Sequence, residues 1–375
     1  MLKIFLTGDN HIGLKYASHS AGDVLCKKRI DAFEGMVQKA NDEECDLFVV
    51  AGDLFESTGG VAKRDIKTLV EMLSRFRGTV AVLPGNHDYY DPDVKVWAAF
   101  ADAMVSYDNI LLLTKYMPYT LSVGEDKVIL YPAHCTTLHS EPGKNNLGWM
   151  KEIEINEDAY HIGIAHGAVE GETIDKEGAY FLMSREELEA IPMDVWLLGH
   201  THVPFPRSFR ENTWTAGERI FNAGTHVQTD VSCNTEGVCF IIEINEQKEV
   251  KAENYVSGNV RFYRKTIPLS EGEMERKLQE ELKNIGDESV VDLILTGAVS
   301  EEEYNSRHAM LEKMLGRFIE GTYRDGALTR RITKELIAEE FSETSFSAGL
   351  LTKLLSEPKE AQLAYDLIQT LKGGK

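Results

Sequence analysis

Short apolar runs alternate with amphipathic segments along the first hundred residues of the chain. Apolar residues recur at three- and four-residue spacing in three segments, which predicts helices. The segments are Gly22–Asn41, Lys63–Phe76 and Val94–Ala103. The apolar runs before and between them read as buried strands. A strand, helix, strand, helix, strand order predicts a parallel sheet with all carboxyl ends at one edge.

Five apolar runs of the chain end in aspartate, asparagine or histidine. The residues at these ends are Asp9, His11, Asp53, Asn86, His87, His166, His200 and His202. Because ligands bind at the carboxyl ends of strands in open α/β sheets, we expect these side chains to converge. Each motif on its own also occurs by chance, and a single histidine at the end of a strand usually has a structural role. Together, oxygen and nitrogen donors without a thiolate predict two divalent cations of intermediate hardness, Mn²⁺ or Fe²⁺, rather than a closed structural zinc site.

The pattern changes after the last of these motifs. Strands near Arg219–Asn222, Val238–Asn245 and Glu249–Val256 form an antiparallel run that we expect to complete a second sheet. Capping-box patterns at Ser270/Glu273 and Ser300/Glu303 predict helices beyond it. We therefore predict a main domain over 1–267, a small α/β domain over 268–331, and amphipathic helices over 332–375.

Composition narrows the class of protein. The 375 residues carry a formal net charge of -21, which argues against nucleic-acid binding through a broad basic face. No apolar run approaches the roughly 20 residues that span a bilayer. The first strand begins almost at Met1, which leaves no room for a signal peptide. We expect a cytoplasmic protein with no membrane partner.

The polar motifs resemble the five motifs of the calcineurin-like metallophosphoesterases. They read Asp9-Asn10-His11, Gly52-Asp53, Gly85-Asn86-His87-Asp88, His166 and Gly199-His200-Thr201-His202. The resemblance covers about residues 1 to 260. It implies an α/β fold of two facing sheets flanked by helices, an α-β-β-α double β-sandwich, followed here by the small C-terminal α/β domain.

The same resemblance implies a role for each motif residue. Asp9, His11, Asp53 and His202 would hold one metal, and Asp53, Asn86, His166 and His200 the other. The cofactors implied are two divalent ions, Mn²⁺ first and Fe²⁺ or Zn²⁺ as alternatives. His87 would face the scissile phosphate as a hydrogen-bond donor or general acid, and Asp88 would orient its ring.

Within this superfamily the chain is most similar to the SbcD-type DNA-repair exonucleases. The similarity rests on Gly52–Glu56, the Asn222–Thr225 turn and the size of the C-terminal α/β unit. It implies in-line attack of a metal-bridging hydroxide on DNA phosphodiester bonds, and an SbcC-like coiled-coil ATPase or a homodimer as partner. The family usually has Pro-Gly-Ser/Thr-Pro where this chain has a turn ending in His226. We consider Arg207, Arg210 and His226 as substrate contacts.

Two other functions stay open. A phosphodiesterase or phosphatase acting on a small molecule would tolerate the acidic balance more easily. A metallophosphoesterase fold used only as a binding scaffold is the non-enzymatic alternative, against which the complete ligand set argues.

Overall fold

The computed structural model describes residues 1–155, 158–171, 178–206, 217–233 and 235–373. They form two compact units, Met1–Arg261 (the first unit) and Phe262–Lys375 (the second unit). The predicted domain limit at 267/268 falls inside a strand that begins at Arg261, so the units divide six residues earlier.

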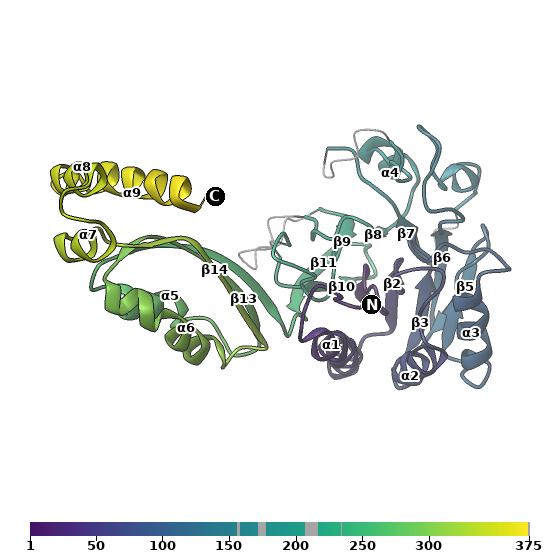
Figure 1. The fold of residues 1–375 in the computed structure, drawn as a ribbon. Coiled ribbons are helices and arrows are strands. Elements are labelled where there is room, and N and C mark those ends of the chain that lie inside the picture. The colour runs from purple at the N-terminus through teal and green to yellow at the C-terminus, as the bar shows by residue number, and fades with distance from the viewer. Residues whose placement is uncertain (156–157, 172–177, 207–216, 234, 374–375) are drawn as a thin grey trace. The chain divides into compact units, whose positions relative to one another are not determined.

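The first unit contains two sheets (Figure 1). The six-stranded sheet has the order β11 (Val250–Val256), β10 (Val238–Ile244), β1 (Leu2–Thr7), β2 (Leu47–Ala51), β3 (Thr79–Leu83), β4 (Ile110–Leu112). The five-stranded sheet has the order β5 (Tyr119–Val123), β6 (Asp126–Ala133), β7 (Tyr160–His166), β8 (Val195–Gly199), β9 (Ile220–Asn222).

Three apolar layers hold this unit together. The inner faces of both sheets share one core, to which Leu47, Val49 and Ala51 of β2 contribute. The alternate residues Phe48 and Val50 face a second core beneath three helices. These helices are α1 (Gly22–Asp42), α2 (Lys63–Ser74) and α3 (Lys95–Met104). Because β2 is covered on both faces, its residues are all apolar.

The outer face of the five-stranded sheet packs against α4 (Arg185–Ala190) and the 3₁₀ turn η1 (Gly148–Met150). The order helix, sheet, sheet, helix confirms the predicted α-β-β-α fold. One expectation was wrong: β10 and β11 do not complete the second sheet. β10 pairs antiparallel with β1 and so extends the first.

The second unit contains a three-stranded sheet with two helices, followed by a helical segment. Its elements are β12 (Arg261–Ser270), α5 (Met274–Leu282), β13 (Ser289–Val299), α6 (Glu301–Leu315), β14 (Glu320–Arg330), α7 (Lys334–Glu340), α8 (Phe346–Leu354) and α9 (Pro358–Gly373). The sheet order is β12-β13-β14. The last three helices have an apolar cluster of their own. Among the described residues, no helix has both the length and the apolar content needed to cross a membrane.

The two predicted capping boxes behave differently. Ser300 and Glu303 form a complete capping box at the start of α6. Ser270 ends β12 instead, and α5 begins only at Met274. The Glu303 carboxylate also accepts hydrogen bonds from the backbone N–H groups of Gly272 and Met274. One side chain therefore caps two helices.

Candidate metal centre

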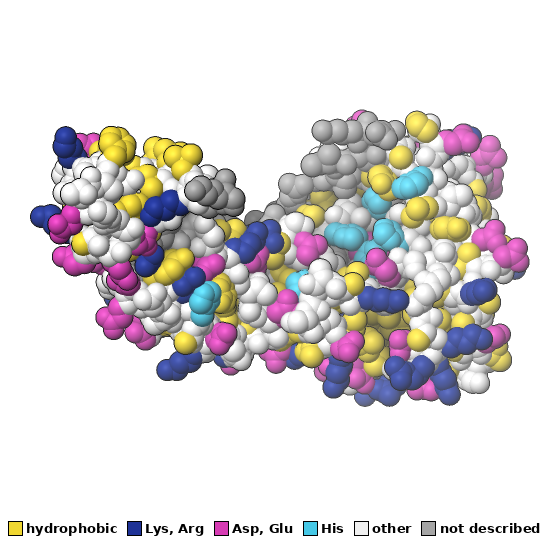
Figure 2. Space-filling model, in the orientation of Figure 1, with side chains coloured by type: hydrophobic (Ala, Val, Ile, Leu, Met, Phe, Trp, Pro, Cys, Tyr) yellow, Lys and Arg dark blue, Asp and Glu magenta, His cyan; other side chains and the backbone are white. Residues whose placement is uncertain are grey.

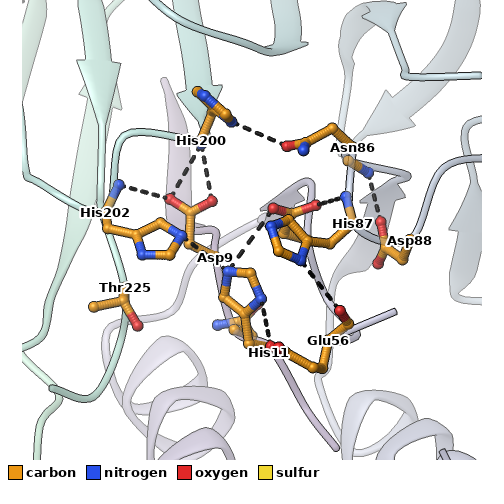
Figure 3. A network of polar contacts seen from close by, with 12 residues as sticks. Asp9, His11, Glu56, Asn86, His87, Asp88, His200, His202 and Thr225 are labelled. Carbon is orange, nitrogen blue, oxygen red and sulfur yellow. Dashed lines mark hydrogen bonds and ion pairs between the residues drawn. The ribbon is translucent and has the colours of Figure 1, made fainter. Parts of the chain in front are cut away.

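The predicted ligands come together at the carboxyl ends of β1, β2, β3, β7 and β8 (Figure 3). β1, β2 and β3 are parallel neighbours, so the loops after them emerge at the same edge of the first sheet. β7 and β8 are parallel neighbours in the second sheet. In the space-filling view, histidine side chains gather on one face of this unit (Figure 2).

The backbone at the ligands is unusual. Asp9, His11, Asp53, His200 and His202 have φ values of 49°, 44°, 50°, 109° and 54°. Non-glycine residues avoid this region, at a cost of roughly 1–3 kcal/mol each, unless their surroundings impose it. Backbone hydrogen bonds between the two loops hold this conformation here. Asp9 N–H donates to Gly52 O (3.1 Å), and His11 N–H donates to Asp53 O (2.9 Å).

The first half of the centre contains Asp9, His11, Asp53 and His202. One potential donor atom from each lies within 4.8 Å of the others. His11 Nε2 and His202 Nε2 are 2.9 Å apart. The carboxylate of Asp9 accepts hydrogen bonds from the backbone N–H of His200, at 2.9 and 3.1 Å, which fixes its direction.

The second half contains Asn86, His166 and His200. Asn86 Oδ1 lies 3.0 Å from both His166 Nε2 and His200 Nδ1. The amide nitrogen of Asn86 donates to Leu138 O (3.3 Å), so its oxygen faces the centre. His166 Nδ1 contacts the carbonyl of Ala51 at 2.9 Å and must therefore donate to it, which leaves Nε2 as the ligand atom.

Asp53 lies between the halves. Its Oδ2 is 3.8 Å from His11 Nε2 and 3.3 Å from His166 Nε2. Burial would raise the pKa of this carboxyl group, but the nearby imidazoles of His166 and His11 outweigh burial and lower it. In return, although burial opposes it, Asp53 raises the pKa of His166 to about 9. Within the described part of the chain, no hydrogen bond reaches Asp53 Oδ2.

These observations fit a pair of divalent cations. A buried carboxylate oxygen without a donor is costly unless a cation satisfies it. Neighbouring ligands of an octahedral cation with bonds of about 2.1 Å are about 3.0 Å apart. The separations of 2.9 and 3.0 Å between donor atoms within each half lie close to this value, and Asp53 Oδ2 lies farther from the imidazoles, at 3.3 and 3.8 Å. The predicted choice of Mn²⁺ stays a prediction, because oxygen and nitrogen donors also accept Fe²⁺ or Zn²⁺.

Comparison with protein families agrees with this geometry. The model of the calcineurin-like phosphoesterases matches residues 2–204. The chain belongs to this family. Membership agrees with the metal-dependent phosphoester chemistry that the motifs predict, and it does not identify the substrate.

Individual relatives are distant from this chain. A segment of 98 residues is 36% identical to a "Transmembrane protein with metallophosphoesterase domain" from Bos taurus, and it covers 26% of the chain but 19% of that relative. The structure of TT1561 from Thermus thermophilus has 12% identity and a TM-score of 0.43, over 68% of this chain and 98% of that one. A dimetal phosphatase from Danio rerio has 11% identity and a TM-score of 0.38, over 68% and 98%.

The predicted general acid, His87, lies beside the first half of the centre. Its ring meets that of His11 edge to face, with centroids 4.9 Å apart. Its Nδ1 is 3.2 Å from the carbonyl oxygen of Glu56, which can only accept, so Nδ1 carries a proton. Nε2 is then the nitrogen available to a substrate.

Asp88 does not orient that ring, so this expectation was wrong. Its two carboxylate oxygens accept the backbone N–H groups of Gly85 (2.7 Å) and Phe55 (2.9 Å). Its backbone oxygen accepts from the indole of Trp97. Burial, together with the charge of Asp53, raises its pKa to about 7. Asp88 therefore shapes the turn that presents Asn86 and His87.

Glu56 is a site residue that the motifs did not identify. Its Oε2 lies 3.0 Å from His11 Nδ1, and its backbone carbonyl holds His87. Although burial opposes it, Glu56 raises the pKa of His11. Its position directly after Gly-Asp-Leu-Phe is the one local signal for this role. A cavity of about 800 Å³ borders Glu56, His87 and His202.

Of the three expected substrate contacts, the structure describes one, His226. His226 is completely buried, and its Nε2 donates to the backbone oxygen of Arg29 at 3.0 Å. The structure thus contradicts a substrate contact by His226, because the side chain cannot reach the cavity. Arg207 and Arg210 lie outside the described residues.

Proposed function

We propose that this phosphoesterase is an SbcD-type DNA-repair nuclease subunit that cleaves phosphodiester bonds of DNA. The dimetal centre carries the proposal, because it suits a phosphodiester as well as a monoester. Two further features support it: Glu56 directly after Gly-Asp-Leu-Phe, and an α/β unit with further helices that follows the first unit in the sequence.

The residues divide the chemistry between them. Bound cations would activate a water molecule and neutralise charge on the phosphate. Asp53 would be shared by both, with Oδ1 fixed by the backbone N–H of His87 at 2.8 Å. His87 Nε2 would face the phosphate from the cavity side and, when the ring is doubly protonated, donate a proton to the leaving oxygen.

A partner would supply the affinity for DNA. Among the described residues that line the cavity, Lys15 is the one lysine or arginine, and Glu56 and Asp230 are acidic. With a net charge of -21, the isolated chain repels a polyanion at long range. We propose that the partner is an SbcC-like coiled-coil ATPase, with a homodimer as the alternative source of additional DNA contacts.

The helix α9 presents a surface suited to such a partner. Leu363, Leu367 and Leu371 are 63%, 57% and 81% exposed. Their four-residue spacing places them on one side of the helix, as in helices that dock against a coiled coil. Hydrophobic side chains gather on these C-terminal helices in Figure 2.

Substitution on α9 tests the docking surface. Leu367→Lys should weaken binding of the ATPase by at least about tenfold, because it places a charge in an apolar contact. Gln362→Lys is the control, because it adds the same charge on another side of α9. Calorimetric titration of the coiled-coil ATPase compares the two. Equal affinities for both variants would remove α9 from the interface.

A substrate panel tests the activity itself. Linear duplex DNA, a cyclic nucleotide, bis(p-nitrophenyl) phosphate and p-nitrophenyl phosphate would be compared with Mn²⁺, with and without the ATPase. We expect DNA cleavage to require the same residues as diester cleavage, with Asp53→Asn as the inactive control. Cleavage of the small substrates alone, in every assembly, would contradict the nuclease proposal.

That outcome would favour the second candidate, a phosphodiesterase or phosphatase for a small molecule. The cavity of about 800 Å³ favours it, since pockets for small ligands measure about 300–1,000 Å³. The salt dependence of DNA binding separates the two. Each phosphate neutralised on duplex DNA adds about 0.9 to the slope. We expect a shallow slope for this chain alone and a steep one with the ATPase.

A further inference from the structure

Arg29 of α1 is buried beneath the first half of the centre. It is 1% exposed, yet it carries a charge that has no role in the family motifs. Its guanidinium group donates to backbone carbonyls and hydroxyls on two separate segments. The acceptors are Asn10 O (2.6 Å), Asp9 O (3.3 Å), Val227 O (3.3 Å), Thr225 Oγ1 (3.1 Å) and the Tyr16 hydroxyl (3.2 Å).

The guanidinium group has no carboxylate partner among the described residues. A buried cation without one is unfavourable unless several dipoles replace its hydration. Five acceptors do so here, and two of them belong to the turn that carries the metal ligands Asp9 and His11. Asp9 and His11 are also two of the residues with left-handed backbone.

The second segment is held from both sides. His226 Nε2 donates to the backbone oxygen of Arg29, while the Arg29 side chain binds the residues on either side of His226. Thr225 Oγ1 also donates to Val227 O at 2.9 Å, which keeps this turn closed. The chain departs from the family pattern at His226, and this contact with α1 gives that departure a structural reason.

We infer that Arg29 is a positioning residue for the first metal half: it clamps the Asp9–His11 turn to Thr225–Val227 in the conformation that ligation requires. None of the described acceptors of the Arg29 side chain belongs to the second half. Asn86 and His166 are held by Leu138 and Ala51, and only the backbone N–H of His200 reaches the clamped turn, at the Asp9 carboxylate. Loss of the clamp should therefore weaken one metal selectively. The inference depends on the dimetal centre and not on the identity of the substrate.

Lysine cannot replace arginine in this position. The acceptors surround a planar fork of N–H donors, whereas an ammonium group is a compact point charge. Arg29→Lys keeps the charge and removes the fork. It is therefore a sharper test than a neutral substitution, which would change both.

Calorimetric titration with Mn²⁺ tests the clamp without any substrate. We expect Arg29→Lys to weaken the first metal site by about 10- to 100-fold, the usual effect of losing an outer contact that orients a ligand. The second site should change by less than about threefold. His202→Ala removes a ligand that Arg29 does not contact and leaves Asp9 and His11 in place, so adding Arg29→Lys to it should weaken the remaining first site further.

Two controls separate positioning from stability. Met36 lies on the same helix and is fully buried, so Met36→Ala leaves a cavity beneath that helix. It should lower the melting temperature without weakening one metal site more than the other. Thr225→Val removes one acceptor at constant shape and should weaken the first site less than Arg29→Lys. Unchanged metal affinity in Arg29→Lys, or an equal loss at both sites matched by Met36→Ala, would overturn the inference.

Discussion

The first unit buries the polar side chains that define its chemistry, whereas the second unit pairs its polar side chains at the surface. Asp9, Asp53 and His166 are each at most 1% exposed. In the second unit, Asp292 on β13 pairs with Arg264 of β12 and Arg324 of β14, at 2.7 and 2.6 Å, and both arginines are half exposed. Burial strengthens electrostatic interactions, and water weakens them.

Backbone conformation follows the same division. All nine described non-glycine residues with positive φ belong to the first unit, and five of them are predicted metal ligands. In the described residues of the second unit, positive φ occurs only at Gly272 and Gly297. The first unit thus concentrates unfavourable backbone conformations at residues whose binding of a cation would offset the cost, and the second unit is a conventional packing of helices on a sheet.

Asp53→Asn should have the largest effect of any single change. It removes the charge that both halves share, so both metals should dissociate. Activity should fall by more than the roughly 10²–10³-fold cost of removing one preorganised contact to the transition state. Metal analysis of the purified variant provides the measurement. Two tightly bound ions with normal activity would show that the carboxylate is not shared.

His87→Asn should keep both metals and lose turnover by roughly 10²-fold, the scale of a general acid. Its ring contributes no ligand atom to the predicted set, so metal content is the control. Activity and melting temperature are measured on the same preparation. A variant that melts early but has full specific activity would instead assign His87 a structural role.

Acid should destabilise the first unit through His134. Burial lowers the pKa of this histidine to about 4, whereas it titrates near 6.5 when unfolded. Its contribution to stability is present above pH 6.5 and is lost as the pH falls towards 4, by up to about 3 kcal/mol. His134→Phe should lack this part of the pH dependence.

Tryptophan fluorescence can follow that unfolding selectively, because all four tryptophans precede residue 262. Urea titrations at pH 7.5 and 5 would compare wild type with His134→Phe. The same loss of stability in both proteins would assign the acid response to other groups.

Arg324→Gln should have the smallest effect. An exposed ion pair contributes about 0–1 kcal/mol to the free energy of unfolding, and Asp292 retains Arg264 as a partner. Metal binding and activity on a small diester should not change. A loss above about 2 kcal/mol would mean that the second unit depends on a polar network as strongly as the first.

The sequence was sufficient to predict that the candidate ligands converge, because each follows a strand whose apolar run can be recognised in the sequence. The runs of β1, β2 and β3 are apolar, and Asp9, Asp53 and Asn86 come two or three residues after they end. Parallel pairing of these strands then places the three side chains together.

Contacts between residues far apart in the sequence could not be predicted from local patterns. The contact between Arg29 and Thr225 joins residues 196 apart, and nothing in the local pattern of α1 marks it. β14 was missed because it contains one fully buried side chain, Leu328, and so shows no apolar alternation. β10 was assigned to the wrong sheet for a related reason: the sequence of an antiparallel strand does not indicate which sheet edge the strand will pair with.

That last pairing has a consequence for how the chain reaches its native state. β1 precedes β10 along the chain, yet one of its edges stays unpaired until Val238–Ile244 has been synthesised, more than 230 residues later. Contacts of such sequence separation form slowly, and an unpaired hydrophobic edge invites association with other chains. A fragment that stops at residue 204, where the family match ends, would contain every predicted metal ligand and still expose β1. We expect such a fragment to aggregate rather than to act as a minimal enzyme.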